Sequence, residues 1–139
     1  MTHAAAARHA RSGGKAARGI AILVGAFYVL VGLWAFLAPA GFSGTVAPFP
    51  PYNQHLFHDA GAFQVGLGLA LLLAAMARTA LQPALLAVLA ASLLHVVSHV
   101  EDRTLGGHVT DVPALSLLCA LLALAAVLEF RAMFRRLER

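Results

Sequence analysis

Residues 81–102 read LQPALLAVLAASLLHVVSHVED, and this stretch decides the fold. Its first part, Leu81 to Val100, contains no Lys, Arg, Asp or Glu. An α-helix needs about 20 mostly apolar residues to cross the hydrocarbon core of a bilayer. The run nevertheless ends in two histidines four residues apart and two carboxylates, and ionisable groups are costly at membrane depth. The stretch therefore predicts a membrane-spanning helix that carries a candidate site at one end.

Three further apolar runs of similar length occur in the chain. It has 139 residues, of which 60% are hydrophobic and 12% charged. This composition lies outside the usual range for soluble domains. We therefore expect an all-α integral membrane protein, a four-helix bundle of up-down-up-down topology, because short connections make neighbouring helices antiparallel. The predicted domain covers residues 19–130, with spans at 19–38, 60–77, 81–100 and 112–130.

The basic residues predict how the spans are oriented. Four of the ten lie in residues 1–18, four lie in residues 131–139, and the others are Arg78 and Arg103. Cytoplasmic segments carry the excess of Lys and Arg. We expect two basic cytoplasmic tails, 1–18 flexible and 131–139, in a protein of the bacterial plasma membrane with both termini cytoplasmic. The positive charge then reflects topology, with some attraction to anionic headgroups, and not nucleic-acid binding.

A cleaved signal peptide is the alternative for the first run. Four basic residues precede it, and Ala38-Pro39-Ala40 resembles a cleavage site. The apolar core of a signal peptide is roughly 7–15 residues long, which is shorter than this run. We expect a retained helix.

Small residues predict which helix faces pack closely, because association in lipid relies on close backbone approach. The second span carries a row at four-residue steps that leads back to His58. The third span carries a similar row that leads forward to His95 and His99. The expected packing faces are Gly25 and Gly32 with Tyr28 in the first span, Ala62, Gly66, Ala70 and Ala74 in the second, Ala87 and Ala91 in the third, and Ser116, Ala120 and Ala123 in the fourth.

The expected topology brings HLFHD, residues 55–59, close to HVVSHVED, residues 95–102, on the outer side. Five of the seven histidines and four of the six acids fall on that side, including His108 and Asp111 in the second outer connection. We predict a site between the second and third spans. Its ligand candidates are His58, His95, His99, Asp59 and Asp102, and its supporting candidates are His55, His108, Glu101 and Gln64.

Four interpretations of this cluster stay open at this point. Imidazoles with nearby carboxylates suit a transition metal such as zinc, copper or iron. Two histidines on facing helices also suit the axial positions of haem. Intramembrane ionisable residues are commonly proton relays or substrate ligands, which allows a proton-linked or quinone-facing site. Finally, the same groups can serve only to fix the helix ends and the loops.

The remaining polar features do not indicate catalysis. No Ser-His-Asp or Cys-His arrangement stands out, so no catalytic residue is predicted and enzyme activity is left undecided. Cys119 is expected to be a buried apolar thiol. The first outer loop, rich in proline and glycine, is expected to contain no regular element before Pro51 and to cap the outer rim. Asn53 is expected to help cap the second span.

Two segments, GAFQVGLGLALLLAA (61–75) preceded by HLFHD and LLHVVSHVEDRTLGGH (93–108), resemble small bacterial membrane proteins grouped as DoxX-like, including actinobacterial ones. The resemblance covers residues 19–130. It implies a four-helix fold and, for some relatives, association with membrane redox complexes. The leading hypothesis is therefore a metal- or haem-binding membrane protein in a redox-associated role. The alternatives are an accessory subunit of a larger membrane complex and a small proton-coupled transporter, the latter as a homodimer.

Overall fold

The computed structural model describes residues 3–77 and 79–138, without the side chains of residues 3–12 and 136. This part of the chain is helical and contains no strand. Its elements are α1 (His3–Leu37), α2 (Pro39–Thr45), α3 (Gln54–Ala77), α4 (Leu81–Glu101) and α5 (Asp111–Leu137). The four long helices are all long and apolar enough to cross a membrane, as expected for an all-α membrane bundle.

The ends of the helices differ from the expected boundaries. Helix α1 begins at His3, so residues 3–18 are helical and continuous with the first span, and α5 continues to Leu137. Candidate spans run over Gly13–Leu37 and Asp111–Arg135. Arg78, and residues 1–2 and 139 of the expected tails, lie outside the described residues.

Helix α2 corrects one prediction, because residues 39–45 form a helix where none was expected. Pro39 cannot continue α1, since proline disfavours helical geometry in the residue before it. Proline does suit the first turn of a new helix, where its missing N–H would have no partner in any case. The side chain of Phe42 is buried against Trp34 and Phe57, with ring centroids 5.5 and 6.0 Å away.

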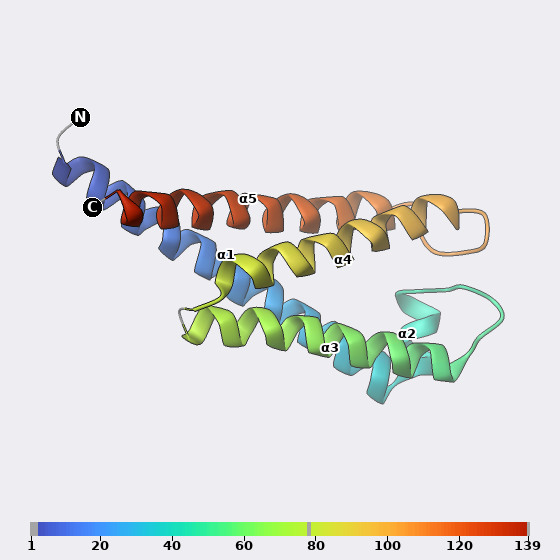
Figure 1. The fold of residues 1–139 in the computed structure, drawn as a ribbon. Coiled ribbons are helices and arrows are strands. Elements are labelled where there is room, and N and C mark those ends of the chain that lie inside the picture. Colours follow the sequence, from blue (N-terminus) through green and yellow to red (C-terminus); the bar gives the residue numbers. More distant parts are fainter. Residues whose placement is uncertain (1–2, 78, 139) are drawn as a thin grey trace.

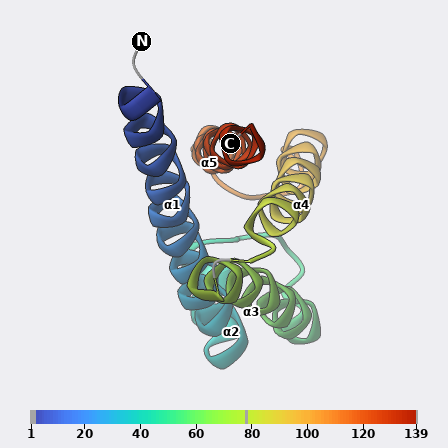
Figure 2. The ribbon, with the colours of Figure 1, turned by 60° about the vertical axis from the view of Figure 1, so that its left-hand side comes forward.

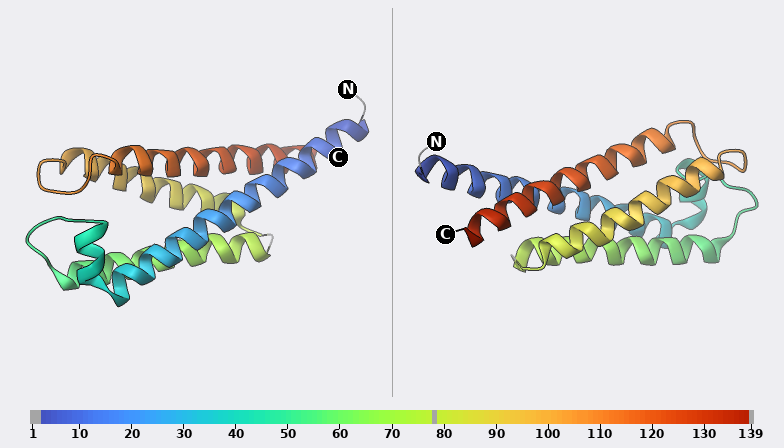
Figure 3. Two further views of the ribbon diagram at one scale, coloured as in Figure 1. Left: turned by 180° about the vertical axis from the view of Figure 1, so that it is seen from behind. Right: turned by 45° about the horizontal axis from the view of Figure 1, so that its top comes forward.

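Helix α1 is the centre of the arrangement. It crosses the molecule diagonally, from the C-terminal end of α5 to the N-terminal end of α3 (Figures 1 and 3). It packs extensively against α3 and α5, and α4 packs against α5. Figure 2 shows α5 between α1 and α4, with α3 below them beside the lower part of α1. Helices α3 and α4 touch little, because they diverge from the turn that joins them. The bundle is therefore held together mainly through α1 and α5.

Glycines create the close contact between α1 and α3. A Cβ added to Gly68 would lie 2.6 Å from the carbonyl oxygen of Gly25, and one added to Gly61 would lie 2.6 Å from that of Gly32. The two pairs are seven residues apart on both antiparallel helices. One further heptad along, Arg18 donates a hydrogen bond from Nε to the carbonyl oxygen of Ala75, at 3.0 Å. That bond satisfies a carbonyl near the end of α3, where intrahelical donors run out.

The expected face of α1 is thus confirmed. The expected row on α3 is wrong for three of its four members, and only Ala74 is buried. Ala62, Gly66 and Ala70 are exposed, and nothing lies within 4 Å of a Cβ added to Gly66. Steps of four residues turn around a helix by roughly 40° each, since 3.6 residues complete a turn. Steps of seven residues drift by only about 20°. The heptad pair Gly61 and Gly68 therefore stays on the face toward α1.

The rows expected on the last two spans are corrected in the same way. On α4 the buried face consists of Leu81, Leu85, Val88 and Ser92, while Ala87 is exposed and Ala91 only half-buried. On α5 the buried residues include Cys119, Leu122, Ala125 and Ala126, while Ser116 and Ala120 are exposed. Cys119 is a buried thiol, as expected.

Gly68→Ala should lower the free energy of unfolding by about 1–3 kcal/mol, because the new methyl group meets backbone atoms that cannot move aside. Gly66→Ala is the matched control. It should be neutral or stabilising by up to about 1 kcal/mol, because alanine favours the helix and the site is open. Unfolding of the two variants in the same detergent measures the difference. Equal stability of both variants would contradict the α1–α3 contact described here.

Candidate functional site

The candidate site lies at the end of the bundle where α3 begins and α4 ends, which we call the loop end. Residues 46–53 and 102–110 connect the helices there (Figure 1). The backbone N–H of Gly107 donates to the carbonyl oxygen of Pro48, at 3.2 Å, which ties the two connections together. Gly107 has φ +83°, and an added Cβ would lie 2.8 Å from Asp111 Oδ2 and 2.9 Å from the Phe49 ring. Only glycine suits this backbone conformation at such close range.

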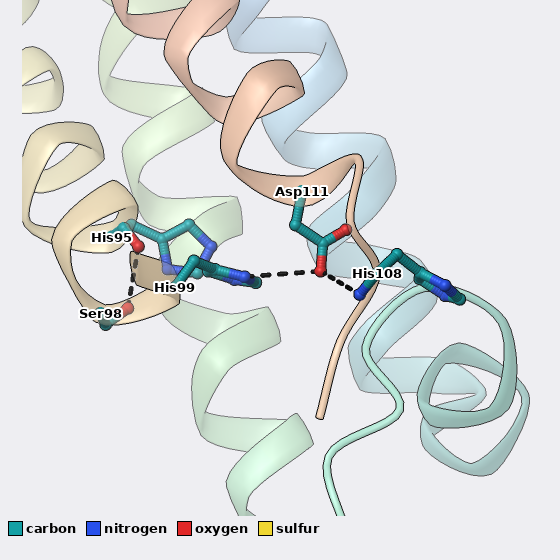
Figure 4. A network of polar contacts seen from close by, with 5 residues as sticks. All are labelled: His95, Ser98, His99, His108 and Asp111. Atoms are coloured by element: carbon teal, nitrogen blue, oxygen red, sulfur yellow. Dashed lines mark hydrogen bonds and ion pairs between the residues drawn. The ribbon is translucent and has the colours of Figure 1, made fainter. Parts of the chain in front are cut away.

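Asp111 and His99 form the centre of the site. His99 Nδ1 lies 3.5 Å from Asp111 Oδ2, and these side chains are only 15% and 16% exposed. The same carboxylate oxygen accepts a hydrogen bond from the backbone N–H of His108, at 2.8 Å. Figure 4 shows the imidazole of His99 directed at the carboxylate. Asp111 also occupies the first turn of α5, where the helix dipole favours negative charge.

His95 adds a second imidazole to this pair. The rings of His95 and His99 are nearly perpendicular, with centroids 4.8 Å apart. The edge of the Phe49 ring covers His99 on another side, with centroids 5.5 Å apart. Ser98 turns away and donates its hydroxyl proton to the backbone carbonyl of His95. Within the described residues no hydrogen bond is made by the imidazole of His95, which is exposed. The cluster therefore has a ring nitrogen available for a ligand or water.

The inward face of α4 explains why the histidines come together. Residues 81, 85, 88, 92, 95 and 99 alternate steps of four and three, which is the heptad spacing of a helix face packed in a bundle. The first three are buried apolar residues, and the last three are Ser92, His95 and His99. Ser92 and His99 are about 10 Å apart along the axis, at 1.5 Å per residue. The face is thus apolar over its first half and polar toward the loop end.

A buried hydrogen bond marks the deep end of the polar half. The hydroxyl groups of Tyr28 in α1 and Ser92 in α4 lie 2.7 Å apart, and Ser92 also donates to the carbonyl oxygen of Val88, at 2.6 Å. Tyr28 is therefore the donor to Ser92. Tyr28 and Ser92 are 7% and 4% exposed. Beyond them lies the main apolar core, which includes Val24, Leu71, Leu85 and Leu122.

The expected site between the second and third spans does not form as one cluster. His58, on α3, packs against Phe36 of α1, with ring centroids 5.0 Å apart. His55 and Asp59 pair with each other at 3.5 Å on the exposed side of α3. The physical reason is the divergence of α3 and α4, which leaves the two histidine segments in different surroundings. Within residues 3–77 and 79–138, no group of three or more His, Cys, Asp or Glu side chains could hold a metal ion.

The other candidates take local structural positions or face outward. Asp102 ends α4, with its N–H bonded to the carbonyl oxygen of Ser98. Glu101 is exposed, and His108 contributes its backbone while its side chain is exposed. Gln64 packs beside Gly32, and its Oε1 is buried without a hydrogen-bond partner in the described part of the chain. Asn53 accepts a bond from the N–H of Leu56 at 3.3 Å, which confirms the expected cap of α3.

Sequence reasoning misses the roles of three residues. It predicts Asp111 at the rim but not among the ligands, it predicts only packing for Tyr28, and it predicts no role for Ser92. The heptad spacing along α4 was the available signal, because it places Ser92, His95 and His99 on one face. The pairing with Asp111 had no comparable signal, since it depends on how the 102–110 connection folds back.

Comparison with known proteins adds no relative. No family model matches the chain, no curated protein matches it, and no solved structure matches it. The resemblance to DoxX-like proteins therefore stays a prediction.

Tyr28→Phe should lower the free energy of unfolding by about 0.6 kcal/mol, the average for a single interhelical hydrogen bond in a membrane. The largest such effect is about 1.7 kcal/mol. The substitution removes the bond between α1 and α4 without changing the ring. Tyr52→Phe is the control, because Tyr52 is exposed. If the two variants unfold alike, the Tyr28–Ser92 bond contributes nothing to the bundle.

Proposed function

We propose that the protein is a multi-pass membrane protein whose His95–His99–Asp111 cluster takes up and releases protons at one membrane interface. The carrying observation is the 3.5 Å contact between His99 and Asp111, both largely buried, with the His95 ring packed on His99. Histidine is the side chain whose ordinary titration range falls between about pH 5 and 8. A carboxylate removed from water needs a compensating partner, and the imidazole of His99 lies where it can act as that partner.

The surroundings support proton exchange more than they support a metal or haem centre. Metal binding by this cluster alone would rest on two imidazoles, with Asp111 engaged by His99 and the His108 backbone. Haem ligation was expected to use His58 opposite His95 or His99. His58 instead packs against Phe36 of α1. The positive-inside pattern supports placing the cluster on the extracytoplasmic side of a bacterial plasma membrane.

The apolar core argues against a proton path through a single copy of the chain. The polar face of α4 stops at Ser92, and the next residues on that face, Val88 and Leu85, are buried among apolar side chains. A relay needs ionisable or hydroxyl groups, or water, across the whole span. The cluster is therefore a site that exchanges protons with one side only. That property suits a protein that supplies or accepts protons for a ligand or partner in the membrane.

Infrared difference spectra between about pH 8 and pH 5, across the titration range of histidine, test the proposal. The purified protein in lipid should show imidazole and carboxylate bands that change together. His99→Gln and Asp111→Asn should each abolish the coupled bands, because each removes one partner. His55→Gln is a matched control, since it removes the exposed His55–Asp59 pair. Persistence of the coupled bands in both His99→Gln and Asp111→Asn would refute the proposal.

A second candidate function is that of an accessory subunit, and the exposed small residues of α3 favour it. Ala62, Gly66 and Ala70 are exposed in the described chain, and nothing lies within 4 Å of a Cβ added to Gly66. Such a row permits close approach of a partner helix. Gly66→Leu should leave the stability of the isolated protein unchanged and reduce its co-purification with a membrane partner severalfold. Unchanged co-purification, or purification of the wild type without any partner, would count against this function.

A further inference from the structure

The opposite end of the bundle carries a concentration of positive charge on two helices. The start of α1 and the end of α5 lie side by side there (Figures 1 and 3). A Cβ added to Gly13 would lie 3.6 Å from the carbonyl oxygen of Leu128, and Ala17 and Ala132 are fully or almost fully buried. These small residues let the two helices approach closely. The basic residues of both helices therefore lie at the same end of the bundle, which we call the α1–α5 end.

The charges at this end are mostly of one sign. Residues 13–18 and 128–138 contain Lys15, Arg18, Arg131, Arg135 and Arg136, against two acids, Glu129 and Glu138. Arg18 is bonded to the carbonyl oxygen of Ala75. Lys15 and Arg131 are exposed, Arg135 is half-buried, and none of these three forms an ion pair with an acid in the described part of the chain. Their charges are available to an anion from outside the chain.

Exposed apolar side chains lie along the same part of α5 as these charges. Phe130 and Phe134 are 48% and 52% exposed and pack together with ring centroids 5.3 Å apart, and Leu137 is 76% exposed. The candidate spans begin at Gly13 and end at Arg135. The basic groups therefore lie where the hydrocarbon core gives way to headgroups. The surface combines cationic donors with an apolar flank, which fits a phosphate group attached to acyl chains.

We propose that the α1–α5 end binds an anionic phospholipid of the surrounding bilayer, with Lys15, Arg131 and Arg135 on the phosphate and Phe130 and Phe134 along the acyl chains. A soluble phosphate would not need the exposed aromatic pair. A zwitterionic lipid would offer a positive group next to its phosphate and so gain less from three unpaired cations. This site is independent of the histidine cluster at the loop end.

Binding of phosphatidylglycerol, phosphatidylcholine and inorganic phosphate to the purified full chain in neutral detergent tests this inference. The wild type should bind phosphatidylglycerol in preference to the other two. Each of Lys15→Gln, Arg131→Gln and Arg135→Gln should weaken that binding about fivefold. Arg103→Gln is the matched control, because Arg103 is an exposed basic residue at the loop end. Native mass spectrometry reports the bound lipid, and circular dichroism confirms that each variant keeps its helices.

Three outcomes would overturn the inference. The first is equal binding of phosphatidylglycerol and phosphatidylcholine by the wild type. The second is an equal effect of inorganic phosphate, which would make the site a general anion site. The third is a loss with Arg103→Gln as large as that with Arg131→Gln, which would make the effect one of net charge. If one of the single variants fails to fold, the other two still decide between these results.

Discussion

The backbone contact between α1 and α3 is the constraint on which the rest of the structure depends. Gly25 and Gly32 face Gly68 and Gly61 so closely that no side chain fits between the helices. In lipid, helix association gains little from the hydrophobic effect, and close packing of small residues replaces it. Because this contact holds α3 along one half of α1, the other half of α1 is free to pack on α5. The diagonal course of α1 is a result of these two contacts. The divergence of α3 and α4 is a result of them too.

The divergence of α3 and α4 decides which residues the histidines contact. Helix α4 is held mainly by α5 and by the Tyr28–Ser92 hydrogen bond, and much less by α3. The histidines of α4 therefore meet Asp111 at the start of α5, while His55, His58 and Asp59 stay with α3. Burial makes this pair distinctive, because Asp111 and His99 are largely removed from water and each provides the other with a polar partner. The apolar half of the same α4 face closes the site from below. The position of the cluster at the loop end is therefore a consequence of helix packing.

Much of the fold could be predicted because hydropathy alone identifies four spans, and the glycines of α1 identify its packing face. The partners on α3 and α4 could not be predicted from steps of four residues, since such rows wind away from the neighbour. Heptad spacing would have selected Gly61 and Gly68 and the face that ends in His95 and His99. The candidate site was predicted in part: His95 and His99 do lie together. The partner of His99 depends on the 102–110 connection and on glycines that allow its turn, and neither leaves a periodic signal. Helix α2 was missed because proline was taken as a breaker where it begins a helix.

The central claim is that His99 and Asp111 share protons that come from one side of the membrane. Nitrogen-15 spectra of the histidine side chains, recorded in lipid bilayers across the range from about pH 5 to pH 8, measure this directly. If His99 and Asp111 share protons, the nitrogen-15 signals of the His99 ring should change across this range, and Asp111→Asn should alter that response. A His99 ring that keeps the same protonation throughout, with and without the Asp111 carboxylate, would contradict it.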